Sequence, residues 1–206
     1  MTMDRSLPLR ERKKLRTRRA LADAALRLFA EKGFDVVTLE ELAEEAEVSK
    51  STFSRTFEAK EAAGIEAEAE LWAAFLAEVE AGPLSGPVLG ELHRVLAAAA
   101  SGLDDTWDDR FLATRRLAVS EPALLRYLEH YRARVREQLV ASLAAKLALD
   151  RDDLRLHVLA ELVMTAFSIP GRAWVRGGGA GGRAALLAGL TGAIRAVPAS
   201  LDLAAE

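Results

Sequence analysis

The sequence contains no cysteine, and only three of its 206 residues are histidines. Disulfide bonds and thiolate metal sites are therefore excluded, which fits a protein of the reducing cytosol. Hydrophobic residues make up 50% of the chain, enough to bury a core, yet we expect no segment to approach the roughly 18 to 20 apolar residues of a membrane span. The amino terminus is charged and shows no apolar signal region. These features predict a cytoplasmic, globular and mostly helical protein.

Residues 38–46 have the pattern of a short amphipathic helix with a defined start. Thr38 and Glu41 have the spacing of a capping box, in which each side chain accepts a hydrogen bond from the other residue's backbone N–H. Val37 and Leu42 stand at the two positions of a hydrophobic staple. Apolar residues then recur at the i, i+3, i+4 and i+7 positions that form one buried helical face.

A second short helix is predicted from Ser49, an N-cap residue, to Phe57. Val48 and Phe53 repeat the staple spacing, and Phe57 follows Phe53 by one turn. With both rings turned inward, the polar residues of this helix must point outward, on an element narrow enough for the major groove of DNA. We expect Lys50, Ser51, Ser54 and Arg55 to contact bases.

A longer amphipathic helix precedes this pair and ends at Gly33, a residue suited to a left-handed C-cap. The resulting three-helix pattern, from Thr17 to Glu61, resembles the amino-terminal region of the tetracycline-repressor (TetR) family of bacterial transcription regulators. The strongest shared elements are EKGF at 31–34, Thr38, Val48-Ser49, Thr52-Phe53, Phe57 and Lys60-Glu61. The resemblance implies DNA contacts from Thr38, Lys50, Ser51, Thr52, Ser54, Arg55, Thr56 and Lys60, with Lys60 meeting a phosphate near the start of a fourth helix.

Two features depart from the pattern of that family. Glu47 occupies the turn position where the family usually has glycine, and a left-handed non-glycine residue costs roughly 1 to 2 kcal/mol. The turn is therefore expected either to adopt a different geometry or to tolerate this strain. The aromatic residues that help to grip phosphate in the family are absent at Ser54 and Thr56, and Arg55 is a candidate to replace that grip.

Positive charge is local in this chain. The 28 basic and 31 acidic residues give a net charge of -3, which excludes a uniformly basic DNA-binding protein. Between Arg5 and Arg19, however, eight basic residues accompany one acid, Glu11, for a local net charge of +7, and phosphate attraction should concentrate there. Residues 1–12 are expected to form a flexible basic arm, because Pro8 and scattered charges carry no helical pattern before Lys14. This arm could act as a solubilising tail, or become ordered on DNA.

The remainder of the chain continues the helical pattern and gives an all-α protein of about nine helices. We assign residues 13–73 to a TetR-type helix-turn-helix DNA-binding domain and 74–206 to an effector-binding and dimerisation domain. The resemblance implies a homodimer formed by the last two long helices, and two heads can then reach half-sites about one turn of DNA apart. Pro170 predicts a kink or break just before Arg172. The predicted helices after Lys60 run from about Ala59 to Gly82, Val88 to Ser101, Trp107 to Val119, Glu121 through Leu147, Asp152 to Val175 and Arg183 to Val197.

The resemblance also implies an unknown small-molecule effector held between helices of the body. Candidate contacts are polar or aromatic residues on buried stripes, although such residues more often belong to the ordinary core. They are His93, Trp107, Phe111, Arg115, Tyr131, Met164 and Phe167. No cofactor is expected.

No catalytic or metal site is predicted. The acids at 104, 105, 108 and 109 are interpreted as the first turn of a helix, and neither a histidine at ligand spacing nor a glycine-rich ion loop accompanies them. The segment RGGGAGGR at 176–183 lacks the order of a phosphate loop and is interpreted as a flexible connector. The chain is therefore predicted to be a ligand-responsive DNA-binding regulator, a repressor on family grounds, and not an enzyme. The alternative is a helical small-molecule carrier or partner-binding protein whose head has lost DNA binding.

Overall fold

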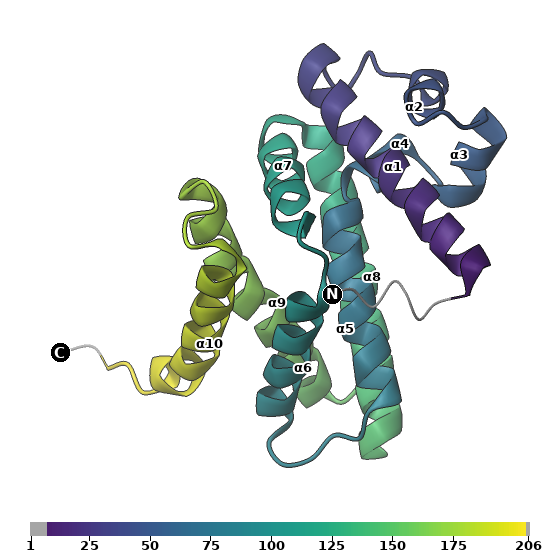
Figure 1. Ribbon diagram of the computed structural model, residues 1–206. Helices are drawn as coiled ribbons and strands as arrows, with labels where there is room; N and C mark the ends of the chain where they lie inside the picture. The colour runs from purple at the N-terminus through teal and green to yellow at the C-terminus, as the bar shows by residue number, and fades with distance from the viewer. Residues whose placement is uncertain (1–7, 205–206) are drawn as a thin grey trace. The chain divides into compact units, whose positions relative to one another are not determined.

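The computed structural model describes residues 8–204, and all regular secondary structure in that range is α-helical (Figure 1). The all-α prediction is confirmed. The ten helices are α1 (Leu9–Lys32), α2 (Leu39–Glu45), α3 (Lys50–Thr56), α4 (Lys60–Gly64), α5 (Glu66–Ala81), α6 (Val88–Gly102), α7 (Trp107–Ser120), α8 (Pro122–Leu147), α9 (Leu154–Arg176) and α10 (Gly182–Leu201).

The chain divides into two compact units. The first contains the described residues up to Glu70 together with Asp104–His130, and the second contains Leu71–Leu103 and the residues from Tyr131 onward. The sequence-based boundary at residue 73 placed α7 in the body, whereas by its packing α7 belongs with the amino-terminal helices. Helices α5 and α8 each contribute residues to both units.

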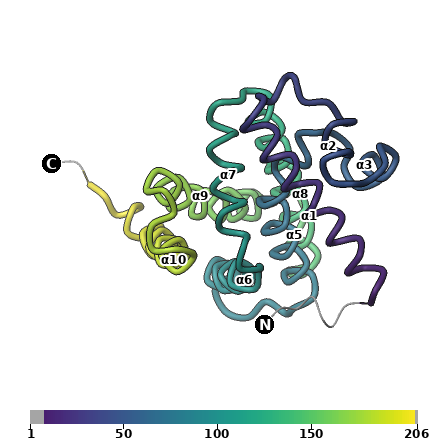
Figure 2. The backbone as a smooth tube through the Cα atoms, turned by 45° about the horizontal axis from the view of Figure 1, so that its top comes forward, coloured from purple at the N-terminus to yellow at the C-terminus, as the bar shows by residue number. Residues whose placement is uncertain are grey.

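In the first unit, α1 packs against α2, α4 and α7, with α7 on the other side of α1 from α2 and α3 (Figures 1 and 2). Leu21 and Phe29 of α1 and Leu42 of α2 are buried at its centre. Helix α1 begins at Leu9, so the prediction of a flexible arm over residues 1–12 is wrong for residues 9–12. Pro8 explains the early start, because proline needs no backbone partner for its nitrogen and its carbonyl accepts from Arg12 N at 3.0 Å. Residues 1–7, including Arg5, lie outside the described range.

The single helix expected from Ala59 to Gly82 is interrupted at Ile65, which makes the tenth helix. In a continuous helix the Gly64 carbonyl would accept from the backbone N–H of Glu68. Here it accepts from the Thr114 hydroxyl at 2.9 Å, and Glu68 N donates instead to Ile65 O at 3.0 Å. The interruption thus depends on a residue of α7, fifty positions away in the sequence.

The second unit is built on α6, α9 and α10, with aromatic packing between α5 and α9. Trp72 contacts Phe75 and Phe167 edge to face, at ring-centroid distances of 5.9 and 5.2 Å. Helix α10 packs along α9 and α6. Arg183, at the start of α10, donates to the Ala100 and Leu103 carbonyls at 3.1 and 2.7 Å, and so satisfies carbonyls at the end of α6.

Helix α9 runs without interruption from Leu154 to Arg176 with Pro170 inside it. Of the predicted kink or break before Arg172, the break is therefore wrong. Pro170 instead forms part of the surface that α10 packs against, opposite Gly189. A Cβ atom added at Gly189 would lie 2.6 Å from Pro170 Cβ, closer than non-bonded carbon atoms approach in folded proteins.

Replacing Gly189 by alanine is expected to destabilise the chain, because the new methyl group forces α10 away from Pro170. Overpacking of this kind costs about 1 to 3 kcal/mol, more than the gain of up to about 1 kcal/mol that alanine brings to a helix. Gly90→Ala, at an exposed glycine of α6, is the control, since nothing lies within 4 Å of its added Cβ and it lies outside the proposed dimer surface. Urea denaturation should show a loss of stability for Gly189→Ala and none for Gly90→Ala; equal effects would contradict this packing.

Helices α9 and α10 are long and apolar enough to cross a membrane by length and composition alone. The expectation that no segment approaches a membrane span therefore fails on that criterion. It is a weak criterion, because helices buried in a core or at an interface also meet it. The most apolar 18-residue window is 44% buried in α9 but only 11% buried in α10, so much of the apolar surface of α10 is exposed.

Candidate DNA-binding interface

The start of α2 has the capping box that the sequence predicts. Glu41 N donates to Thr38 Oγ1 at 3.2 Å, and Thr38 N donates to Glu41 Oε2 at 2.9 Å. Lys32 Nζ lies 2.8 Å from the other carboxylate oxygen of Glu41. The ammonium of Lys32, followed by the backbone and hydroxyl groups of Thr38, lowers the pKa of Glu41 to about 2. The carboxylate that completes the box is therefore ionised throughout the neutral range.

The turn between α2 and α3 keeps a left-handed residue although that residue is glutamate. Glu47 has φ of +53°, its N–H donates to Glu44 O at 2.9 Å, and Val48 N donates to Ala43 O at 2.8 Å. These two bonds form a Schellman motif, which satisfies carbonyls at the end of α2. Of the two alternatives left open by the sequence, the structure shows the second: the geometry is retained with the strain.

Glu47→Gly is accordingly expected to raise the free energy of unfolding by about 1 kcal/mol, since glycine adopts positive φ without the Cβ clash. Ala148 is a matched position: it has φ of +52°, and the following N–H, of Leu149, donates to Ala144 O at 3.0 Å. Ala148→Gly should give a gain of the same sign in urea denaturation. A lower free energy of unfolding for Glu47→Gly would show that the Glu47 side chain makes a stabilising contact that outweighs the strain.

Helix α3 begins at the predicted cap and buries the predicted face. Ser49 Oγ accepts from Thr52 N at 3.2 Å. Phe53 is 0% exposed and Phe57 is 3% exposed, with their ring centroids 5.9 Å apart. The remaining side chains of this seven-residue helix are thereby directed away from the core.

The exposed residues of α3 are those predicted from the inward orientation of Phe53 and Phe57. Lys50, Ser51, Ser54 and Arg55 are exposed, as is Thr38 before α2, while Thr52 and Thr56 are half-buried. Lys50 forms an ion pair with Glu40 of α2, both being largely exposed. Such a pair contributes little in water, so DNA phosphates or base edges can displace it. Thr56 Oγ1 donates to Thr52 O at 2.7 Å and is directed back along the helix.

Two basic residues are turned toward the protein: Lys60, which was expected to meet a phosphate, and Arg18, one of the basic residues between Arg5 and Arg19. Lys60 Nζ donates to the carbonyl oxygens of Phe34, Val37 and Asp35 at 2.7, 3.1 and 3.3 Å. Arg18 Nη1 donates to the Thr56 carbonyl at 2.9 Å. Nothing in the local sequence distinguishes these cations from exposed ones.

A cluster of exposed positive charge lies on the first two turns of α1, where Glu11 is the one acidic residue. These turns precede the buried part of the helix, which starts at Leu21. Their side chains are solvent-accessible and available to a polyanion. The exposed cations are Arg10, Arg12, Lys13, Lys14 and Arg16.

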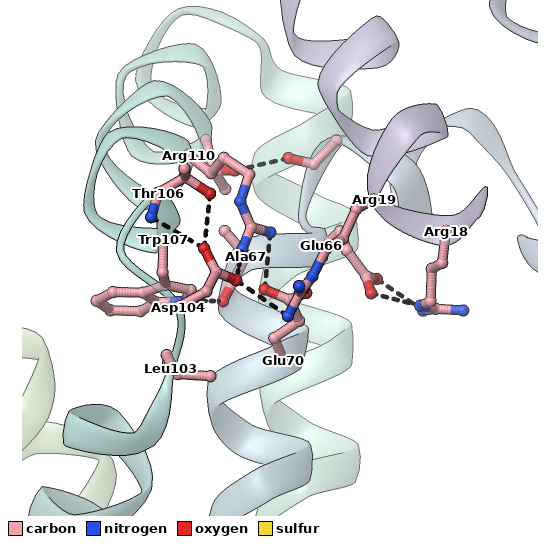
Figure 3. A network of polar contacts seen from close by, with 12 residues as sticks. Arg18, Arg19, Glu66, Ala67, Glu70, Leu103, Asp104, Thr106, Trp107 and Arg110 are labelled. Atoms are coloured by element: carbon pink, nitrogen blue, oxygen red, sulfur yellow. Dashed lines mark hydrogen bonds and ion pairs between the residues drawn. The ribbon is translucent and has the colours of Figure 1, made fainter. Parts of the chain in front are cut away.

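A network of charged residues joins α1, α5 and α7 (Figure 3). Arg110 of α7 is buried and donates to Glu70 at 2.7 Å and to Asp104 at 2.8 Å. Arg19 of α1 contacts the same two carboxylates, at 3.3 and 3.0 Å. Thr106 donates to Asp104 from its backbone at 2.9 Å and from its hydroxyl at 2.6 Å. Sequence reasoning missed this network, because it took Asp104 only as part of a helix start.

The seven effector candidates fall into both units. Trp107, Phe111 and Arg115 belong to the first unit, where Trp107 Nε1 donates to Ala67 O at 2.7 Å and Arg115 pairs with buried Glu68 at 3.2 Å. The other four belong to the second unit, where His93 Nε2 lies 3.1 Å from Thr191 Oγ1. Burial, followed by the charge of Arg195, lowers the pKa of His93. The four effector candidates in the second unit are His93, Tyr131, Met164 and Phe167.

Two pockets of the second unit lie away from these effector candidates. One of about 520 Å³ lies between α8 and α9, and one of about 290 Å³ lies beside the α5–α6 connection. None of the seven candidates lines either pocket. Within residues 8–204 no cluster of three histidine or acidic side chains could hold a metal ion.

Residues 21–62 match the family described as "Bacterial regulatory proteins, tetR family". The chain is 33% identical over 153 residues to the HTH-type transcriptional regulator TcmR of Streptomyces glaucescens. That match covers 70% of this chain and 66% of the relative, just under two thirds of its length.

Two solved structures are similar over nearly their full length. One, from Mesorhizobium loti, is assigned to the TetR family of transcriptional regulators; it is 22% identical, with a TM-score of 0.50, over 91% of this chain and 97% of its own. The other, a transcriptional regulator from Rhodococcus sp. Rha1, is 18% identical, with a TM-score of 0.51, over 91% of this chain and 99% of its own. At these identities the likeness establishes the fold.

Proposed function

Because the chain belongs to the tetR family of bacterial regulatory proteins, we propose that it is a cytoplasmic transcriptional regulator that binds a palindromic DNA operator as a homodimer. The proposed role is that of a repressor whose DNA binding responds to a small molecule, and not that of an enzyme. Of the candidates for effector contact, we retain the four in the second unit, because that unit also contains the two pockets.

The observation that carries the proposal is the outward surface of α3. Two buried rings anchor a short capped helix, and every exposed side chain on it is a hydroxyl or a cation. Such groups donate to base-edge acceptors and to phosphates, and arginine pairs with guanine in particular. We propose that Ser51, Ser54 and Arg55 contact bases, and that Thr38, Lys50, Thr52 and Thr56 contact the backbone or support those contacts. The exposed cations of α1 would add sequence-independent attraction.

The proposed dimer surface is the exposed face of α9 together with α10. Leu154, Val158 and Ile169 of α9 are 77%, 56% and 51% exposed, and their spacing of four and eleven residues places them on one stripe. Exposed apolar stripes of this kind usually mark an interface. Exposed small residues on α10 allow close approach of a partner helix: Ala184, Ala185, Ala188, Gly192 and Ala196.

Ile169→Glu is expected to weaken the dimer by a factor of about 100 or more, because it buries an unpaired charge in the interface. Sedimentation equilibrium should give twice the 22.3 kDa chain mass for the wild type and a shift toward 22.3 kDa for the variant. Leu125→Glu, at an exposed apolar residue outside this surface, is the control and should remain dimeric. Dimeric behaviour of Ile169→Glu would place the interface elsewhere.

The function is tested by selecting bound sequences from random DNA duplexes with the purified protein. The proposal requires an enriched palindrome and an affinity that falls steeply with salt as counterions are released. Failure of the folded, ligand-free protein to enrich any sequence would remove the DNA-binding role and favour a carrier.

A further inference from the structure

Lys60, the first residue of α4, has its ammonium group fully engaged inside the first unit. The group has three N–H donors, and three carbonyl oxygens lie within 2.7 to 3.3 Å of it. The same nitrogen lies 4.4 Å from the centroid of the Phe34 ring, within range of a cation–π interaction. A phosphate could gain this ammonium only at the expense of those contacts.

The three carbonyls belong to the segment that leads from α1 into α2. Val37, the last of them, immediately precedes Thr38, the N-cap of α2. This segment has no regular structure of its own, so its carbonyls depend on partners from elsewhere. Lys60 supplies those partners and thereby holds the position from which α2 begins.

Arg18 acts in the same way at the other end of the helix pair. It donates to the carbonyl of Thr56, the last residue of α3, and its Nη2 donates to Glu66 Oε2 at 2.6 Å (Figure 3). Its guanidinium carbon also lies 4.4 Å from the Phe57 ring centroid. Arg18 therefore connects the end of α3 to α1 and to the first residue of α5.

We propose that Lys60 and Arg18 are positioning residues for DNA binding and not phosphate contacts. Lys60 holds the segment before α2, Arg18 holds the end of α3, and together they set the orientation of α3 on the rest of the first unit. This inference rests on the proposed DNA-binding function and assigns these two cations a different role from the exposed ones on α1.

The test compares Lys60→Met and Arg18→Met with the wild type on the duplex that the wild type enriches, across a series of salt concentrations. Each phosphate contact contributes about 0.9 to the slope of log affinity against log salt. Positioning residues should instead lower affinity by about tenfold at every salt concentration, as the loss of a charge-assisted hydrogen bond would, with the wild-type slope. Arg126→Met, at an exposed arginine of α8, controls for the loss of one positive charge.

Amide hydrogen exchange without DNA provides the second readout. It should accelerate at the start of α2 in Lys60→Met and at the end of α3 in Arg18→Met, but not in Arg126→Met. Because the dimer carries each substitution twice, a slope lowered by about 1.8 with unchanged exchange would overturn the proposal. If the wild type binds no duplex, the proposed function fails, whereas the exchange measurement still decides whether these cations hold the two helices.

Lys60→Arg covers the case in which the methionine variants do not fold. Arginine binds phosphate at least as well as lysine, so a phosphate contact would survive this change. The planar guanidinium cannot place three donors on the three carbonyls, so a positioning role predicts a loss of affinity despite the conserved charge. Full affinity of Lys60→Arg would overturn the proposal.

Discussion

Replacement of Phe53 by alanine is expected to abolish DNA binding by unfolding α3. The ring is 0% exposed and supports the whole of a helix that is only seven residues long. A buried phenylalanine replaced by alanine costs about 3 to 5 kcal/mol, and a helix this short has no stability of its own. The loss is comparable to the total stability of many domains, about 5 to 15 kcal/mol.

Urea denaturation, amide exchange in α3 and DNA affinity would measure this effect. Ser54→Ala is the matched control, because Ser54 is exposed on the same helix and its truncation should change stability by no more than about 0.5 kcal/mol. The control can change DNA preference without changing stability. A penalty below about 1 kcal/mol for Phe53→Ala would contradict the burial that directs the polar face of α3 outward.

Arg110→Met is expected to destabilise the chain by about 3 to 5 kcal/mol at neutral pH, since removing one partner from a buried ion network leaves the other charges uncompensated. Arg110 is 7% exposed, and Glu70 and Asp104 are 10% and 13% exposed. Arg116→Met, at an exposed arginine on the same helix, should have little effect. Denaturant midpoints of the two variants give the comparison.

The penalty for Arg110→Met should shrink in acid. Burial raises the pKa of Asp104, but the hydrogen bond from Thr106 and the charges of Arg110 and Arg19 outweigh it, and the pKa lies below its ordinary value. A carboxylate with a lowered pKa stabilises the fold above its unfolded pKa, about 3.9, and that contribution is lost as pH falls through the folded pKa. Without Arg110 the Asp104 carboxylate can protonate at higher pH, which relieves part of the uncompensated charge. An equal penalty at pH 7 and near pH 4 would contradict this account.

Local signals predicted most of the fold. The starts of α2 and α3 were predicted to the residue, because a capping side chain and its backbone partner are three residues apart. The interruption at Ile65 could not be predicted, since it depends on the hydroxyl of Thr114, fifty residues away. The predicted break at Pro170 failed because tertiary packing can outweigh the roughly 3 kcal/mol that an interior proline costs its own helix. Here the proline ring packs against Gly189 of α10, a contact that the sequence does not reveal.

The candidate site, like the fold, was predicted only in part. The exposed residues of α3 follow from the phase of Phe53 and Phe57, and the structure places them as predicted. The internal roles of Lys60 and Arg18 do not follow from sequence, because their carbonyl partners lie 23 to 38 residues away and a carbonyl carries no side-chain signature. The proposed DNA contacts themselves remain predictions.

The most direct test of the central claim is a parallel selection from random duplexes by the wild type and by Arg55→Gln. The account predicts a palindrome for the wild type and, for the variant, changed or relaxed preference at symmetry-related positions, with a discrimination loss of about 1 to 3 kcal/mol per base pair. Identical enriched sequences for the two proteins, or none for the folded wild type, would contradict the assignment of base recognition to α3.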